Sequence, residues 1–134
     1  MYAADTASKS LGMVLEEVRP GYARMSMKVR PDMLNGHQIM HGGLTFTLAD
    51  STFAFACNSY NINAVASGCS IEFLRPAQLD EVLVAEAQET ILQGRHGVYD
   101  ITVRGSDGTL VAVFRGKSAQ IKGSVLGDAV TGDK

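Results

Sequence analysis

The sequence has no tryptophan, only three prolines and two cysteines among 134 residues, and no uninterrupted run of 18 apolar residues. A helix that crosses a bilayer needs about 20 predominantly apolar residues, so the sequence predicts no membrane-spanning helix. Cys57 and Cys69 have neither CxxC spacing nor the density of a disulfide-rich protein, which favours a reduced, cytoplasmic setting. We expect both cysteines to be packing residues.

The sequence also lacks a strong charge of either sign. It carries 12 Lys and Arg against 14 Asp and Glu, with a net charge of −2 and no basic block, which speaks against nucleic acid or a membrane surface as a partner. The first ten residues, MYAADTASKS, lack the basic start and apolar run of a secretory signal. A hydrophobic content of 46% is typical of a globular protein. We predict a single domain over residues 1–134.

Periodicity predicts several strands. The stretch GYARMSMKVR, Gly21 to Arg30, alternates strictly between apolar and polar residues, as a half-buried strand does. Further strands are expected at residues 64–74, 82–92, 98–104 and 110–121. The turn residues Gly-Ser-Asp-Gly at 105–108 make the last two an antiparallel hairpin. We expect a short N-terminal helix within residues 1–12, from Ala3 to Leu11, and a flexible tail over residues 123–134.

One long helix is expected between the first strand and the others, from Gly43 to Asn58. Its sequence, GLTFTLADSTFAFACN, is apolar nearly all round, and such a helix belongs in a protein interior. The sequence therefore predicts an α+β protein in which a long antiparallel β-sheet wraps around one central buried α-helix. Open edge strands of such a sheet invite pairing with a second copy of the chain.

Asp50 is the only charged residue between His41 and Glu72. An ionised carboxylate in an apolar interior is costly unless it is paired or hydrogen-bonded, and Asp50 lies too far into the helix to cap it. One interpretation is a structural aspartate that accepts a hydrogen bond from Ser51 or Thr47. The other, which we favour, is a partly desolvated carboxylate that acts as general base or nucleophile.

Gly42 and Gly43 leave the first amides of this helix accessible, and free N–H groups at a helix N-terminus favour the negative oxygen of an attacked carbonyl. Gly43 and Asp50 are seven residues apart, which places them roughly 10 Å apart along the helix axis. One carbonyl cannot readily contact both in a single subunit. If both act on the same carbonyl, the acid and the amides come from different subunits of a symmetric dimer with two composite sites.

Other chemistries find little support. His37, His41 and Asp50 could be considered as metal ligands. His37 lies in a loop, however, and the glycine pair breaks any helical face that the three could share, so we expect no metal site. The sequence has no G-x-S-x-G, P-loop, dinucleotide fingerprint or HExxH motif. A set of aromatic residues either lines an aromatic pocket or belongs to the core: Phe46, Phe53, Phe55, Tyr60 and Phe73.

Asn35, His41-Gly42-Gly43 and Asp50, followed by Phe73-Leu74-Arg75-Pro76, occur in an order that resembles the hotdog-fold acyl-CoA thioesterases. The closest resemblance is to the phenylacetate-degradation (PaaI-type) thioesterases, through LNGHQIMHGG, LADSTFAFACNS and AVASGCSIEFLRPA. The resemblance implies the hotdog fold and a dimer with a continuous sheet, commonly a dimer of dimers. It also implies hydrolysis of an aromatic acyl-CoA, of phenylacetyl or hydroxyphenylacetyl type, to the acid and CoA.

The same resemblance implies roles for individual residues. Asp50 would act as general base or nucleophile, Gly42 or Gly43 would supply the amide that polarises the thioester carbonyl, and Asn35 and His41 would orient the carbonyl, the water or the loop. Some relatives carry a serine on the strand after the helix. Here the register from Pro76 puts Ala66 at that position and Ser67 on the opposite face.

No cofactor is implied, because coenzyme A is part of the substrate. A set of residues is predicted to contact the CoA phosphates and pantetheine arm, with Gly116 allowing close approach: Arg75, Arg95, Arg115, Gly116, Lys117, Ser67 and Gly68. Two alternatives remain at this point. One is a hydratase or dehydratase that acts on acyl thioesters in the same fold, and the other is a non-catalytic acyl-CoA-binding sensor.

Overall fold

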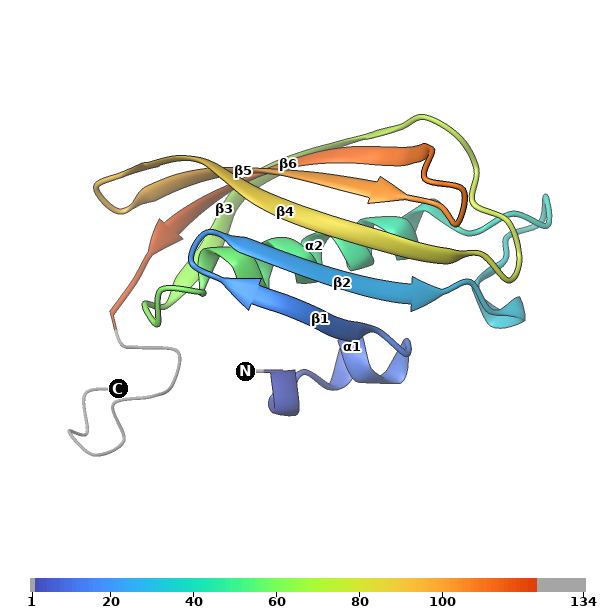
Figure 1. Ribbon diagram of the computed structural model, residues 1–134, viewed down its shortest axis with the longest axis horizontal. Helices are drawn as coiled ribbons and strands as arrows, with labels where there is room; N and C mark the ends of the chain where they lie inside the picture. The colour runs from blue at the N-terminus through green and yellow to red at the C-terminus, as the bar shows by residue number, and fades with distance from the viewer. Residues whose placement is uncertain (1, 123–134) are drawn as a thin grey trace.

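The computed structural model describes residues 2–122, and it has one antiparallel sheet that curves around one long helix (Figure 1). The strands are β1 (Val14–Arg19), β2 (Tyr22–Lys28), β3 (Ala64–Phe73), β4 (Val82–Gln93), β5 (His96–Arg104) and β6 (Leu110–Gln120). The helices are α1 (Thr6–Ser10) and α2 (Gly42–Cys57), with short 3-10 turns η1 (Tyr2–Ala4) and η2 (Pro31–Met33). The order of strands in the sheet is β1-β2-β4-β5-β6-β3. The predicted α+β architecture is confirmed.

The alternation of β2 places one face in the core. Ala23, Met25, Met27 and Val29 are at most 1% exposed, as the sequence predicts. The opposite face is less exposed than a period of two implies, since Tyr22 is also buried. Its ring lies under the Arg19 guanidinium, 3.9 Å from the ring centroid, and its hydroxyl donates to Glu86 Oε2 at 2.5 Å.

The sequence did not predict β1, and it predicted too long an N-terminal helix. The segment VLEEVR does not alternate strictly between apolar and polar residues. In the structure, a bulge between Leu15 and Glu17 shifts the register of β1 against β2, which accounts for the broken pattern. The predicted helix is α1 alone, preceded by η1. Asp5 caps the N-terminus of α1, and its carboxylate oxygen Oδ1 accepts the N–H of Ser8 at 3.0 Å. The predicted flexible tail, 123–134, lies outside the described residues.

The apolar helix α2 is the centre of the core. Phe53 is 1% exposed and lies against Tyr99 of β5 and Phe114 of β6, with ring centroids 5.7 and 5.9 Å apart. Burial of such rings is among the largest apolar contributions to stability. No helix within residues 2–122 combines the length and hydropathy needed to span a bilayer.

The strand β3 is an edge of the sheet. Within residues 2–122 it pairs only with β6, and a bulge at Ser67 shifts the register between Ala66 and Gly68. Large apolar side chains on or next to this strand stay exposed: Val65 is 47%, Phe73 55% and Leu74 55% exposed. An unpaired edge with exposed apolar side chains is a template for another strand.

Candidate active site

The two glycines at the start of α2 are not equivalent. His41 is the N-cap residue, and its imidazole Nδ1 accepts the N–H of Gly43 at 3.0 Å. The hydroxyl of Thr47 donates to the Gly43 carbonyl at 2.8 Å. Among residues 2–122 no hydrogen bond engages the N–H of Gly42. Gly42 therefore offers the free donor at the positive end of the helix.

Gly42 lies on a cleft of about 330 Å³ that Asn35 also lines. The side-chain oxygen of Asn35 accepts the N–H groups of His37 at 2.9 Å and Ile39 at 3.4 Å. These bonds fix the loop and leave the Asn35 side-chain NH₂ without a partner in the described part of the chain. The other walls are mostly apolar: Ile39, Met40, Phe73, Leu74, Pro76, Ala77 and Val111. A polar donor pair beside apolar walls is typical of a small-molecule site.

Phe73 is the aromatic residue that reaches this cleft. Its ring lies so close to Gly42 that a Cβ there would be 3.2–3.3 Å from two ring atoms. Phe53 and Phe55, by contrast, are 1% and 5% exposed and belong to the core. Phe73 is therefore a pocket-lining residue, whereas Phe53 and Phe55 are core residues.

Asp50 lies on the one stripe of α2 that the sheet leaves uncovered. Gly43, Thr47, Asp50 and Ala54 follow one another at helical spacing, and each is at least partly exposed. The carboxylate accepts no hydrogen bond from residues 2–122, because Thr47 donates to Gly43 and Ser51 bonds to Ser8. Burial raises the pKa of the Asp50 carboxyl above its ordinary value. The structural interpretation, in which Ser51 or Thr47 holds the aspartate, is wrong.

Asp50 and the Gly42 amide do not share a site within one chain. They are eight residues apart in the same helix, which corresponds to about 12 Å along the axis. Asp50 is not among the residues that line the cleft at Gly42. A single carbonyl group is too small to contact both.

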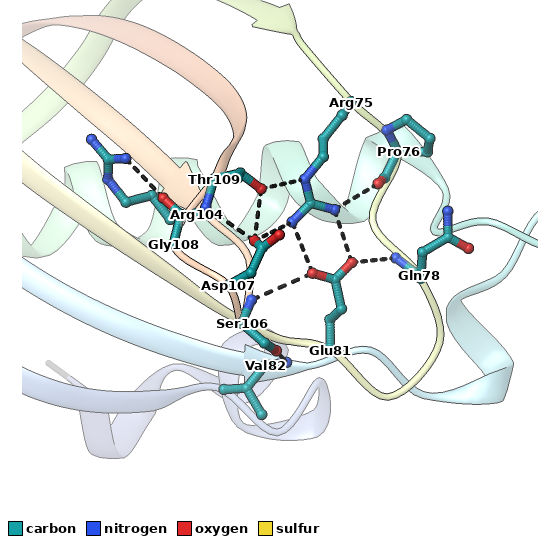
Figure 2. Close-up of polar contacts among 10 residues, drawn as sticks. All are labelled: Arg75, Pro76, Gln78, Glu81, Val82, Arg104, Ser106, Asp107, Gly108 and Thr109. Carbon is teal, nitrogen blue, oxygen red and sulfur yellow. Dashed lines mark hydrogen bonds and ion pairs between the residues drawn. The ribbon is translucent and has the colours of Figure 1, made fainter.

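Arg75, predicted to bind CoA, is instead committed to a network within the chain (Figure 2). Its Nε donates to Thr109 Oγ1 at 2.8 Å, and its terminal nitrogens donate to Pro76 O, both oxygens of Glu81 and Asp107 Oδ1 at 2.9–3.3 Å. These contacts use all five donors of a guanidinium. The network ties the segment before β4 to the turn between β5 and β6, and so holds the rim of the cleft at Pro76. We withdraw Arg75 as a CoA ligand.

Glu81→Gln is expected to lower the free energy of unfolding by about 2 kcal/mol at pH 7, because the hydrogen bonds between Arg75 and the carboxylate are charge-assisted. The bond from Arg75 lowers the pKa of Glu81 from 4.5 to about 2. Since the folded pKa lies below the unfolded one, the stabilisation is complete above about pH 4.5 and is lost as the pH falls toward about 2.

Urea unfolding of the wild type and Glu81→Gln at several pH values measures this difference. Asp80→Asn is the matched control, because its ion pair with Lys28 is long, at 3.8 Å, and both side chains are mostly exposed. A difference between the wild type and Glu81→Gln that does not shrink between pH 4.5 and pH 2 would contradict the assignment.

Three of the other predicted CoA residues line one pocket on the sheet, and Arg95 lies in the turn between β4 and β5. Gly68, Arg115 and Lys117 line a second pocket, of about 440 Å³, with Cys69, Ser70 and Val98. Arg115 makes a two-point ion pair with Asp100, at 2.8 and 3.1 Å. Lys117 is exposed and forms no ion pair within residues 2–122, and Arg95 is likewise exposed.

Gly116 and Ser67 were predicted to contact CoA, but both make contacts within the chain instead. Gly116 faces the core, where a Cβ would be 2.8 Å from three atoms of the Phe53 ring. The glycine is required by helix packing, so the prediction that it admits CoA is wrong. Ser67 is the bulged residue of β3, and its hydroxyl donates to the Lys117 carbonyl at 3.2 Å. The bulge interrupts the alternation from which its face was predicted.

Within the described residues, no group of three or more His, Cys, Asp or Glu side chains is arranged to hold a metal ion. Cys57 is buried and Cys69 exposed, both unpaired. Burial raises the pKa of the Cys57 thiol to about 12, so this thiol is un-ionised at neutral pH and a poor nucleophile.

Comparison with known proteins gives consistent results. Residues 37–112 match the family model of the thioesterase superfamily. The chain is 46% identical to the acyl-coenzyme A thioesterase PaaI of Escherichia coli, over 96% of this chain and 92% of that protein. It is 37% identical to an Archaeoglobus fulgidus protein described as a putative esterase, over 87% and 75%.

Solved structures agree with these sequence matches. The structure of E. coli PaaI, from the phenylacetic acid degradation operon, superposes with a TM-score of 0.91 over 92% of this chain and 90% of that one. A variant of the phenylacetic acid degradation protein PaaI from Thermus thermophilus superposes with a TM-score of 0.84 at 35% identity, over 87% and 100%.

Proposed function

Because this chain belongs to the thioesterase superfamily, we propose that it hydrolyses aromatic acyl-CoA thioesters, of phenylacetyl or hydroxyphenylacetyl type, to the free acid and coenzyme A. The observation that carries the proposal is the state of Asp50. A half-buried carboxylate that accepts no hydrogen bond from residues 2–122, and whose pKa burial raises, is suited to take a proton from water.

The thioester carbonyl would lie at the start of α2, where its oxygen accepts the N–H of Gly42. This donor is fixed before the reaction, and it stabilises the negative charge that develops on the oxygen. Asn35 lines the same cleft, and its NH₂ group would add a second donor. His41 contributes indirectly, because its imidazole occupies the neighbouring Gly43 amide and fixes the helix start.

Asp50 would then activate the attacking water, or attack the carbonyl carbon itself. In the first route the carboxylate accepts a proton as the water oxygen bonds to the carbonyl carbon. The tetrahedral intermediate collapses with departure of the CoA thiolate, which takes up the proton. In the second route the Asp50 carboxylate attacks the carbonyl carbon, the C–S bond breaks, and CoA departs as the thiolate, which leaves a mixed anhydride between Asp50 and the acyl group. Water then hydrolyses the anhydride to the free acid, and its other proton passes through Asp50 to the thiolate.

A homodimer would complete the site. The separation of about 12 Å along one helix requires that Asp50 and the Gly42 amide act on one carbonyl from different chains. The β3 edge supports such an assembly, since no strand within residues 2–122 pairs with its outer side, and Val65, Phe73 and the adjacent Leu74 are exposed. Two β3 strands paired antiparallel would form a continuous sheet. Association of two such dimers into a tetramer belongs to the same proposal.

The acyl group and the CoA arm have separate candidate places. The cleft beside Gly42 exceeds the ~150 Å³ of an apolar cavity that accepts benzene, and Phe73 offers it an aromatic wall. For the CoA phosphates we propose Lys117, Arg115 and Arg95, with Gly68 giving access at the second pocket. Lys117 is the principal candidate because its ammonium group has no carboxylate partner in the described chain.

Release of free thiol from a panel of acyl-CoA substrates tests the proposal. We expect phenylacetyl-CoA and its hydroxylated forms to show at least a ten-fold higher kcat/KM than acetyl-CoA or hexanoyl-CoA. A preference for the aliphatic substrates would contradict the aromatic assignment. Tight acyl-CoA binding without thiol release would indicate a sensor, and hydration of crotonyl-CoA a hydratase. Light scattering that finds only monomers would contradict the composite site.

A further inference from the structure

The first residues of the chain lie against the turn of α2 that carries Asp50. We call residues 2–13 the N-terminal arm. Figure 1 shows it on the opposite side of the molecule from β5 and β6. Ser8 of the arm is 0% exposed, Met13 is 2% exposed, and the Tyr2 ring lies 5.9 Å from the Phe55 ring of α2. The arm therefore packs on α2 along one flank of the uncovered stripe.

A chain of hydrogen bonds joins the arm to α2 next to Asp50. The hydroxyl of Ser8 donates to Asp5 Oδ2 at 2.6 Å, and its oxygen lies 2.9 Å from the hydroxyl oxygen of Ser51. Because the Ser8 proton is given to the carboxylate, the Ser51 hydroxyl is the donor of the second bond. Ser51 is the immediate neighbour of Asp50.

Ser51 behaves differently from Thr47 and Thr52 of the same helix. Thr47 and Thr52 donate to the carbonyls four residues earlier, Gly43 O and Leu48 O, at 2.8 and 2.7 Å. Such local bonds are the usual choice for Ser and Thr inside a helix. Ser51 instead reaches out of the helix to a side chain of the arm 43 residues away. The bond therefore fixes the helix against another element.

The arm is itself held in place by bonds independent of α2. The Asp5 carboxylate accepts both the N–H and the hydroxyl of Ser8, and the Tyr2 hydroxyl donates to the Met13 carbonyl at 2.5 Å. The guanidinium of Arg30 donates to the Ser10 carbonyl at 3.3 Å. Ser8 is therefore a fixed acceptor for Ser51.

From this geometry we infer that Ser51 and Ser8 are positioning residues for the thioesterase reaction. They hold the α2 turn that presents Asp50, so that its carboxylate meets the thioester carbonyl bound at the Gly42 amide of the other chain. The inference rests on the proposed function of Asp50. Small displacements of a reacting group cost rate: about 1 Å can cost about 10²-fold. Neither serine lines the cleft at Gly42 or the second pocket, so the loss should fall on kcat rather than KM.

Steady-state kinetics with phenylacetyl-CoA on the full chain test the inference. We expect Ser51→Ala and Ser8→Ala each to lower kcat about ten-fold with KM within two-fold of wild type. Ser51→Thr keeps the hydroxyl on a half-buried position and should retain wild-type kcat. The double variant should be no worse than either single one, because both remove the same bond.

Ser10→Ala is the matched control. Ser10 lies on α1, as Ser8 does. Its exposed hydroxyl donates to the Ala7 carbonyl within the arm, at 3.0 Å, and not to α2. Rates are expressed per folded protomer, from the unfolding curve of each variant, so that a loss of stability alone does not lower them. A fall in Ser10→Ala as large as in Ser51→Ala would overturn the inference, as would a failure of Ser51→Thr to restore kcat.

The positioning role and the proposed function fail in different ways. Wild-type kcat in Ser51→Ala, with turnover abolished in Asp50→Asn, would overturn the positioning role and leave the role of Asp50 intact. Wild-type turnover in Asp50→Asn would overturn the proposed function itself.

Discussion

Asp50→Asn should lower kcat about 10³-fold with phenylacetyl-CoA, since a positioned general base contributes roughly 10²–10⁴ in rate. The amide has nearly the same shape as the carboxylate, and the carboxylate has no hydrogen-bond partner within residues 2–122 to lose. The folded protein is expected to be at least as stable as the wild type at neutral pH. Burial raises the pKa of Asp50, so the ionised carboxylate opposes folding above its unfolded pKa, and the neutral amide does not.

The measurement combines turnover, CoA binding by calorimetry and thermal unfolding of the same preparation. Asp80→Asn makes the same chemical change on an exposed residue and should leave all three unchanged. In the wild type, kcat/KM should fall as the pH drops through the raised pKa of Asp50, because only the ionised form accepts a proton. A kcat in Asp50→Asn within ten-fold of wild type would refute the assignment.

Gly42→Pro removes one N–H group and should lower kcat about 10²–10³-fold, the usual cost of one oxyanion-hole donor. Gly42 is the first residue of α2, a position that accepts proline because its N–H has no helical partner. His41 precedes it with φ −62° and ψ 128°, a conformation that suits the residue before a proline. The backbone can therefore take the proline without a change of path.

Gly42→Ala is the matched control for this experiment. Alanine and proline both add a Cβ, which meets the Phe73 ring at 3.2–3.3 Å, but only alanine keeps the N–H. The ratio of kcat between the two variants removes the contribution of the Cβ contact with Phe73, and leaves the loss of the N–H together with the ring carbon that replaces its hydrogen. Equal kcat values in Gly42→Ala and Gly42→Pro would show that the carbonyl does not bind this amide.

Local patterns made the architecture predictable. The alternation in β2 and the apolar character of α2 are short-range signals, and both elements occur where they were expected. The strand β1 was missed because its bulge breaks the period that would have revealed it. The hotdog architecture followed from the resemblance to the thioesterases, which the family match and the superposition on E. coli PaaI confirm.

The sequence identified a site residue only where its role can be inferred from its neighbours in the sequence. Asp50 stood out as a single charge in an apolar helix, and the glycine pair as an open helix start. The distinction between Gly42 and Gly43 depends on the rotamer of His41, which no pattern encodes. Arg75 and Gly116 were misread because Arg75 bonds to Thr109 and Asp107, and Gly116 lies against Phe53, all of them far away in the sequence. Long-range contacts of this kind leave no periodic trace.

Both outer strands of the sheet are kinked. The register of β1 shifts between Leu15 and Glu17, and that of β3 between Ala66 and Gly68. A fibril grows by adding straight strands to both sides of a sheet, and a kink twists the backbone away from such a ladder. Once two β3 strands pair as proposed, β1 is the edge strand at both ends of the sheet, and we expect its bulge to hinder the addition of further strands at high protein concentration.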